Sequence, residues 1–262
     1  MKKLFSILKL QIIDSFTYRG DIFLYSLSGV AHPLIMLAIW LTVINSGGQT
    51  PVSREDFIQY YLFLLVVKTW TGAWSAPFIA SDIRLGQISS LLIRPVPHYF
   101  FLLGGNIGEK LIKTLYIGPL LIILMILFNQ RVPELTFWEW SMVGMTWMGA
   151  ATLTFIADLC VGFTAFWLDN SESVEDGYDL LTHIFSGQLI PIFAFPFILQ
   201  RISMFLPFRY TLSLPLEILL RRLSPQDLIS GVLIQALWIG AGLWLVLMLW
   251  RKGLKRYSAV GA

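Results

Sequence analysis

The chain has 262 residues, of which 56% are hydrophobic and 13% are charged, with a formal net charge of +3. Soluble domains usually carry about a quarter charged residues, and the apolar residues here form long blocks instead of short periodic stripes, which argues against a water-soluble fold. The single cysteine, Cys160, excludes an internal disulfide and a cysteine metal cluster.

The first 20 residues are predicted to form an amphipathic helix that lies along the inner membrane surface. Apolar side chains recur every fourth position, while the charged side chains lie elsewhere on the helix. A simple cytoplasmic extension of the first span is the alternative. The apolar stripe consists of Leu4, Leu8, Ile12 and Phe16.

Six segments approach the roughly 20 apolar residues that cross a hydrocarbon core about 30 Å thick. The sequence therefore predicts an all-α membrane protein in which residues 1–262 form a single transmembrane domain. Residues 183–199 are the weakest span, since the segment is short and contains Pro191 and Pro196. The predicted spans are residues 22–44, 57–80, 111–128, 140–168, 183–199 and 228–250.

Two shorter apolar pieces, residues 202–206 and 212–220, precede the last span and are broken by Pro207 and Pro215. Neither piece can cross a bilayer alone. Segments of this size rest in the interface or dip into the membrane against protein. They are predicted to be a pair of re-entrant or interfacial helices on the outer side.

The lysines and arginines predict the topology, because cytoplasmic loops carry an excess of them. If the N-terminus is cytoplasmic, twelve of the 19 lie on the inner side, six lie on the outer side, and Lys68 lies inside a span. We therefore expect a multi-pass protein of the cytoplasmic (inner) membrane, with both termini in the cytoplasm.

Four residues inside predicted spans are candidates for a substrate path: Lys68, Trp70, Trp74 and Asp158. A charge at the bilayer centre costs about 2.5–3.5 kcal/mol on insertion scales, so each charged residue is expected to have a partner or a hydrated cavity. The two charges could pair, although their depths need not match, and snorkelling to an interface is the alternative. Trp70 and Trp74, one helical turn apart, could line an aromatic pocket, but belt or packing roles are commoner for tryptophan.

Residues 81–97, between the second and third predicted spans, are expected to contain a short cytoplasmic helix. Ser81 can cap its N-terminus, Asp82 suits the positive end of the helix dipole, and Pro95 ends it. Such a helix can dock into a partner or rest on lipid headgroups, and the pattern leaves both readings open. Its apolar face consists of Ile88, Leu91 and Leu92.

The sequence contains no pattern for chemistry of its own. No G-x-x-x-x-G-K-[ST] phosphate-binding sequence occurs, and residues 104–108 lack the strand and the lysine that a phosphate cradle requires. The three histidines lie in different segments. We therefore expect no catalytic site, cofactor or metal in this chain, and no nucleic acid partner.

The order Ile83-Arg84-x-Gly86 followed by Leu91-Leu92-x-Arg94-Pro95, directly after the second predicted span, resembles the permeases of ABC-2 type transporters. Residues 251–258, after the last span, are similar to the ending found in one bacterial branch of that family. The proline-broken segment before the last span is similar as well. The resemblance covers nearly the whole chain.

The resemblance implies a permease that pairs with a second permease, identical or related, and with two ATP-binding cassette ATPase subunits. Those subunits would bind ATP and Mg and drive the export of a small molecule or a lipid-like substrate. It also implies that residues 82–94 form the coupling helix in a cleft of the ATPase and that residues 200–227 are the outer re-entrant helices. The coupling residues would be Asp82, Arg84, Gly86, Leu91, Leu92, Arg94 and Pro95.

Two other functions remain open at this stage. A secondary transporter or channel subunit would not be driven by ATP and would show inverted repeats, of which none is convincing here. A membrane anchor or assembly subunit would also fit a capped cytoplasmic helix. The acidic stretch of residues 169–179 matches no pattern with a known role.

Overall fold

The computed structural model describes residues 2–48, 50, 52–93 and 99–257, which form helices and no strand. The predicted all-α class is confirmed for this part of the chain. The α-helices are α1 Lys2–Thr17, α2 Arg19–Asn45, α3 Arg54–Thr71, α4 Ser75–Arg84, α5 Ile88–Leu92, α6 Tyr99–Leu127, α7 Phe137–Phe163, α8 Glu172–Phe185, α9 Phe197–Phe205, α10 Arg209–Leu219 and α11 Pro225–Arg256, and the 3-10 helices are η1 Thr164–Phe166 and η2 Ile192–Ala194.

Within the described residues, five helical segments are long and apolar enough to cross a membrane. Each overlaps one of the predicted spans, so the multi-pass helical character is confirmed. The second segment combines α3 and α4, which are separated by residues 72–74. The segments are Arg19–Asn45, Arg54–Arg84, Tyr99–Leu127, Phe137–Phe166 and Pro225–Arg256.

The remaining predicted span, residues 183–199, does not form one helix. Helix α8 ends at Phe185, the chain then runs through a non-helical stretch that contains η2, and α9 begins at Phe197. The break has three local causes: Gly187 has a φ of +92°, and Pro191 and Pro196 provide no backbone N–H. The prediction of a continuous helix over these residues is wrong.

Two carbonyls of this break accept hydrogen bonds from side chains of α2 and α3. The Tyr60 hydroxyl donates to the carbonyl oxygen of Gly187 at 2.8 Å, and the Tyr61 hydroxyl donates to that of Leu189 at 2.5 Å. The Trp40 indole also donates to Leu189. These bonds pair carbonyls that the end of the helix leaves without a backbone partner.

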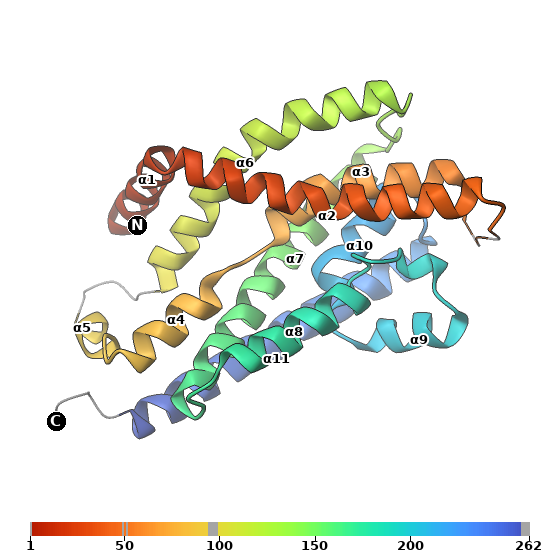
Figure 1. Ribbon diagram of the computed structural model, residues 1–262. Coiled ribbons are helices and arrows are strands. Elements are labelled where there is room, and N and C mark those ends of the chain that lie inside the picture. The colour runs from red at the N-terminus through yellow and green to blue at the C-terminus, as the bar shows by residue number, and fades with distance from the viewer. Residues whose placement is uncertain (1, 49, 51, 94–98, 258–262) are drawn as a thin grey trace.

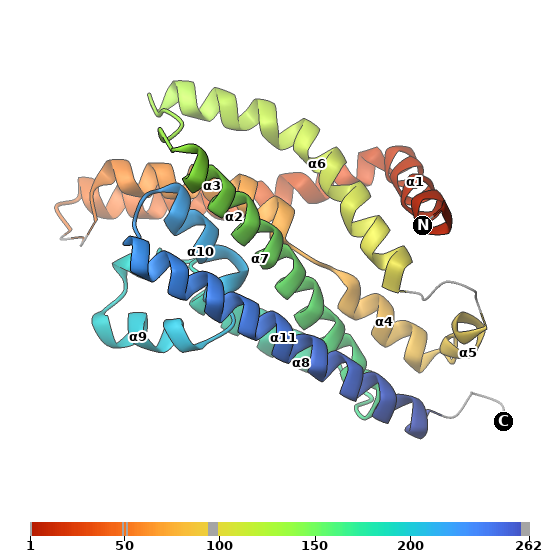
Figure 2. The same cartoon turned by 180° about the vertical axis from the view of Figure 1, so that it is seen from behind.

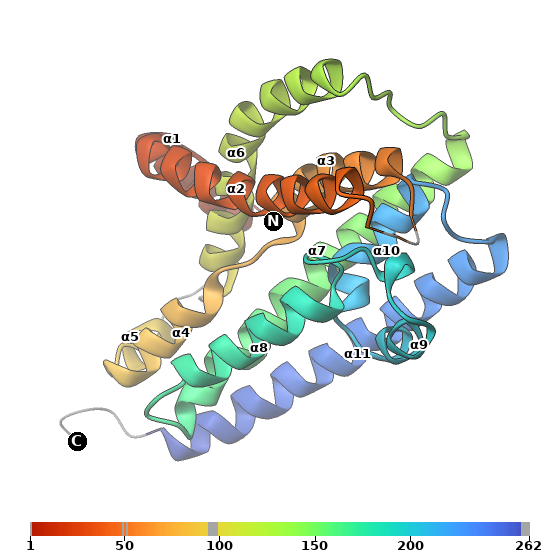
Figure 3. The ribbon, with the colours of Figure 1, turned by 45° about the vertical axis from the view of Figure 1, so that its right-hand side comes forward.

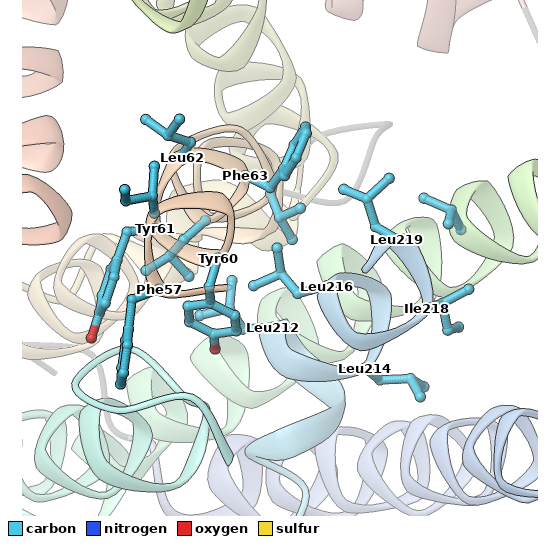
Figure 4. Packing of buried hydrophobic residues seen from close by; sticks show 14 of the residues in the cluster. Phe57, Tyr60, Tyr61, Leu62, Phe63, Leu212, Leu214, Leu216, Ile218 and Leu219 are labelled. Atoms are coloured by element: carbon cyan, nitrogen blue, oxygen red, sulfur yellow. The ribbon is translucent and has the colours of Figure 1, made fainter. Parts of the chain in front are cut away.

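The main hydrophobic core lies between α3, α7 and α10. All eleven residues of α10 are buried, and its leucines face the aromatic side of α3, where Tyr60 approaches Leu212 and Leu216 (Figure 4). Helices α7 and α11 pack along one another. This core also holds the break after α8 in place, since Tyr60 packs in the core and donates a hydrogen bond to Gly187 in the break.

The two pieces predicted before the last span form helices α9 and α10. Pro207 lies in the link between them, as expected, but Pro215 lies inside α10 without ending it. Helix α10 carries a buried ion pair that the apolar pattern did not indicate: Arg209 Nη2 lies 2.5 Å from Glu217 Oε2. The re-entrant placement of α9 and α10 in the membrane stays a prediction.

Helix α5 lies at the same end of the molecule as the beginning of α1 and the end of α11 (Figures 1 and 2). Helices α6 and α11 lie on opposite sides of the core, and α8 runs beside α11 (Figure 3). The N-terminal helix packs against α6. The predicted apolar stripe of α1 does not face α6 along its whole length. Phe16, its last member, is exposed, and the neighbouring Ser15 is buried instead.

Candidate coupling surface and intramembrane polar residues

The predicted coupling segment forms a corner between two helices instead of one capped helix. Helix α4 ends at Arg84, and Gly86 adopts a φ of +73°, in the left-handed region that favours glycine. The N–H of Gly86 donates to the Ile83 carbonyl at 3.2 Å, and the N–H of Gln87 donates to the Asp82 carbonyl at 2.9 Å. This pair of bonds is a Schellman motif, which terminates a helix.

The expected N-terminal cap at Ser81 is therefore wrong, because Ser81 lies inside α4 and the chain reverses five residues later. The physical reason is the membrane span: the second half of the span continues as α4 to Arg84. Asp82 lies in the last turn of α4, so it is at the end of a helix and not at its beginning.

Two of the three predicted apolar residues of the corner point inward. Ile88 is buried and Leu91 is half-buried, and both pack into a cluster that contains Phe166 of η1 and Trp250 of α11. Leu92 was expected on the same face, but its side chain is 50% exposed. Arg94 and Pro95, the last two predicted coupling residues, lie outside the described residues.

Arg84 connects the corner to the acidic stretch of residues 169–179, most of which forms the beginning of α8. Its Nη2 lies 3.6 Å from Glu172 Oε1, and its Nη1 donates to the carbonyl oxygen of Asp169 at 3.4 Å. Glu172 is largely exposed, so the pair contributes at most about 1 kcal/mol to stability. The contact nevertheless shows that the acidic stretch lies beside the corner. No sequence motif predicted this contact, and the opposite charges of Arg84 and Glu172 were the only indication of it.

The C-terminal end of α11 closes the same cluster. The hydroxyl groups of Ser89 and Tyr257 lie 3.2 Å apart, and the Tyr257 ring stacks edge-on to Phe166 with a centroid distance of 6.2 Å. The corner is thus packed against α7, η1 and α11. Its outer side exposes three large apolar side chains, Leu85, Leu92 and Ile93.

Lys68 and Asp158 form no ion pair with one another in the structure. Asp158 Oδ2 accepts hydrogen bonds from the backbone N–H groups of Ser75 and Ala76, the first residues of α4. Because Asp158 is buried, the snorkelling alternative is wrong for it. The carboxylate instead satisfies free amides at the N-terminus of a half-helix inside a span.

Lys68 is half-buried on α3 and faces a polar region shared with α2 and α8. The charge of Asp179 on α8 acts on the Lys68 ammonium group, although no carboxylate among the described residues lies within ion-pair distance of it. On the same side, the rings of His32 and His183 are in edge-to-face contact with centroids 5.6 Å apart. The three histidines looked scattered in the sequence, and the fold brings two of them together.

Trp70 and Trp74 are not neighbours on one helix, because the break at residues 72–74 separates them. Trp70 makes an edge contact with Trp147, with centroids 6.5 Å apart, and Trp74 contacts Phe78 at 4.9 Å. The expectation that they lie one helical turn apart is therefore wrong.

Comparison with known proteins gives one partial similarity and one extended match. The chain is 26% identical over 140 residues to the NAD(P)H-quinone oxidoreductase chain 4, chloroplastic, of Chaetosphaeridium globosum, which covers 49% of this chain and 27% of that protein. The chain thus spans about a quarter of that relative's length, and the similarity carries no statement about activity. No solved structure matches the chain.

The extended match is to a family model. The model described as "ABC-2 family transporter protein" matches residues 31–261, which include the α4–α5 corner, the break after α8 and the whole of α11. Together with the membrane-length helices, this match shows that the chain belongs to the ABC-2 transporter family.

Proposed function

We propose that this chain is the membrane-spanning permease subunit of an ATP-binding cassette transporter and exports a small molecule or lipid-like substrate. A separate ATPase binds ATP and Mg and supplies the energy, and a second permease, identical or related, completes the path. The protein lies in the cytoplasmic membrane with both termini inside. Membership of the ABC-2 family supports the permease role.

The observation that carries the ATPase coupling is the exposed side of the α4–α5 corner. Leu85 is 63%, Leu92 50% and Ile93 86% exposed, at the end of the molecule where α11 finishes in basic residues. Clustered exposed apolar side chains mark interaction sites. Basic residues near the ends of spans indicate the cytoplasmic side, so the corner lies where an ATPase could reach it.

The course of the chain supports six crossings. Helix α7 ends near α5, whereas α11 begins at the opposite end of the molecule (Figures 1 and 2). The segment between them must therefore return across the molecule, and α8 with the break that follows provides this path. Its discontinuous backbone is compatible with a crossing because Tyr60 and Tyr61 satisfy two of its carbonyls.

The transport path is proposed to run along α2, α3 and α8. These helices bring together His32, Lys68, Asp179 and His183, and polar or ionisable groups at membrane depth mark substrate pathways. A second permease facing the same side would enclose the path. In this proposal Lys68 keeps the role in the substrate path that the sequence predicted for it. Asp158 instead caps the N-terminus of α4.

The coupling proposal is tested by copurification and by ATP hydrolysis in reconstituted vesicles. A Leu92→Glu/Ile93→Glu variant is expected to lose the ATPase and its stimulated hydrolysis while still inserting into the membrane. Val132→Glu, an exposed apolar residue in the loop after α6, is the matched control and should retain both. Normal coupling in the double variant would exclude this surface, and transport without any copurifying ATPase would favour the ion-driven alternative.

A further inference from the structure

A groove with a volume of about 920 Å³ lies between α1, α2, α3 and α6. Its walls include the break at residues 72–74, so it reaches the middle of the span formed by α3 and α4. Much of the wall is apolar, with Ile22, Val30, Leu65 and Ile117 from three different helices. None of the predicted coupling residues that the structure describes lines it.

Three lysines line the groove: Lys68 on α3, and Lys110 and Lys113 on α6. Lys113 is paired with Glu109, with Nζ to Oε1 at 2.6 Å. In the described part of the chain, no carboxylate lies within ion-pair distance of Lys68 or Lys110. Both side chains are half-buried in membrane-length helices, where an uncompensated charge is costly.

Three acidic residues line the groove, and none of them forms an ion pair with Lys68 or Lys110, because Glu109 is paired with Lys113. Asp14 and Asp21 are exposed, at the end of α1 and the start of α2, so water screens their charges. Trp74 contributes one more unused donor, since its indole nitrogen is buried and has no acceptor among the described residues. The groove therefore holds two lysines without an ion-pair partner and one indole N–H without an acceptor among the described residues.

We propose that this groove binds one phospholipid of the surrounding bilayer, with the headgroup phosphate held by Lys68 and Lys110. A phosphate provides the charge and the acceptors that these groups lack. The apolar wall along α2 and α6 fits acyl chains, whereas a free phosphate ion would leave this wall uncovered. Basic pockets between membrane helices recognise lipid headgroups in this way. The inference stands on the groove alone and does not depend on the proposed ATPase coupling.

The test uses the purified, delipidated full-length chain and three probes that separate the source of the phosphate. Dioleoylphosphatidylglycerol carries both phosphate and chains, dioleoylglycerol carries chains alone, and inorganic phosphate lacks them. We expect a saturable rise in the thermal unfolding temperature with phosphatidylglycerol only. An equal rise with inorganic phosphate, or with dioleoylglycerol, would overturn the proposed occupant.

Matched variants locate the site. Lys68→Met/Lys110→Met is expected to weaken phosphatidylglycerol binding about tenfold or more, since two charge-assisted bonds are lost. Lys252→Met/Lys255→Met removes two exposed lysines of α11 and should bind as the parent does. Equal affinity of the parent and the groove variant would refute the site. If the groove variant does not fold, a photoreactive phosphatidylglycerol decides on the parent chain: labelling of residues 22–30, 65–74 or 105–117 supports the proposal, and labelling confined to segments that do not line the groove overturns it.

Discussion

The carboxylate of Asp158 on α7 accepts a hydrogen bond from the backbone N–H of Ala76 at the start of α4, with Oδ2 and N 3.0 Å apart. The same oxygen accepts from the N–H of Ser75. The first amides of a helix have no acceptor within the helix. Here these amides lie inside a membrane span, where water does not supply an acceptor. Asp158 therefore makes the interruption of this span possible.

Replacement of Asp158 tests that role. Asp158→Ala leaves two buried amides without an acceptor and is expected to lower the free energy of unfolding by about 2–3 kcal/mol, whereas Asp158→Asn keeps an acceptor oxygen and loses less. The measurement is a titration from mixed micelles into dodecyl sulfate. Asp176→Ala, an exposed acid of α8, is the control and should change little. Equal stability of Asp158→Ala and the control would show that the cap contributes nothing.

Gly86 is expected to determine the corner between α4 and α5. A residue with a Cβ in the left-handed region costs about 1–2 kcal/mol, so Gly86→Ala should loosen the corner, and Gly86→Asn should do so less because asparagine tolerates this conformation. Hydrogen exchange of the amides of residues 85–92 should become faster, while the membrane helices stay protected. Gly240→Ala, at a helical position with open space around it, should leave the corner unchanged. Unaltered exchange in Gly86→Ala would contradict the argument.

Much of the fold follows from the sequence because apolar length is a local property. The blocks without formal charge at residues 22–44 and 228–250 form the bodies of α2 and α11. Pro191 and Pro196 weakened the predicted span at residues 183–199, but apolar length gave the place of neither break, because long-range side chains stabilise both. Asp158 satisfies amides more than 80 residues away, and Tyr60 satisfies a carbonyl 127 residues away.

The candidate site was predictable in part for the same reason. The apolar positions Ile88 and Leu91 recur at helical spacing and do pack inward. The turn at Gly86 and the contact between Arg84 and Glu172 depend on where α4 ends and where α8 begins. Neither boundary is visible in a hydropathy pattern.

Tyr60 is expected to stabilise the break after α8. Tyr60→Phe keeps the packing against α10 and removes only the donor to the Gly187 carbonyl, which should cost about 1–3 kcal/mol of unfolding free energy since that carbonyl is buried. Thermal unfolding in detergent measures the change. Tyr99→Phe, at an exposed position of α6, supplies the comparison and should match the parent. A loss no larger than that of Tyr99→Phe would mean that the break is held by other contacts.

The buried pair of Arg209 and Glu217 in α10 gives the largest expected effects. Glu217 also accepts a hydrogen bond from the Ser213 hydroxyl at 2.8 Å, so its charge is paired and hydrogen-bonded within a helix that is wholly buried. Removal of one partner leaves an uncompensated charge, and Arg209→Met or Glu217→Leu alone should cost about 3–5 kcal/mol. The double variant removes both charges and should cost less than either single change.

The measurement is a double-mutant cycle of unfolding free energies from the same mixed-micelle titration. Glu172→Gln serves as the exposed comparison, because its partner Arg84 lies at the surface and such pairs contribute about 0–1 kcal/mol. If the two single changes in α10 proved as mild as Glu172→Gln, or if their effects simply added, the pair would have no coupled role. A strong coupling would instead show that each charge depends on the other, because the helix has no exposed residue through which either charge could reach water.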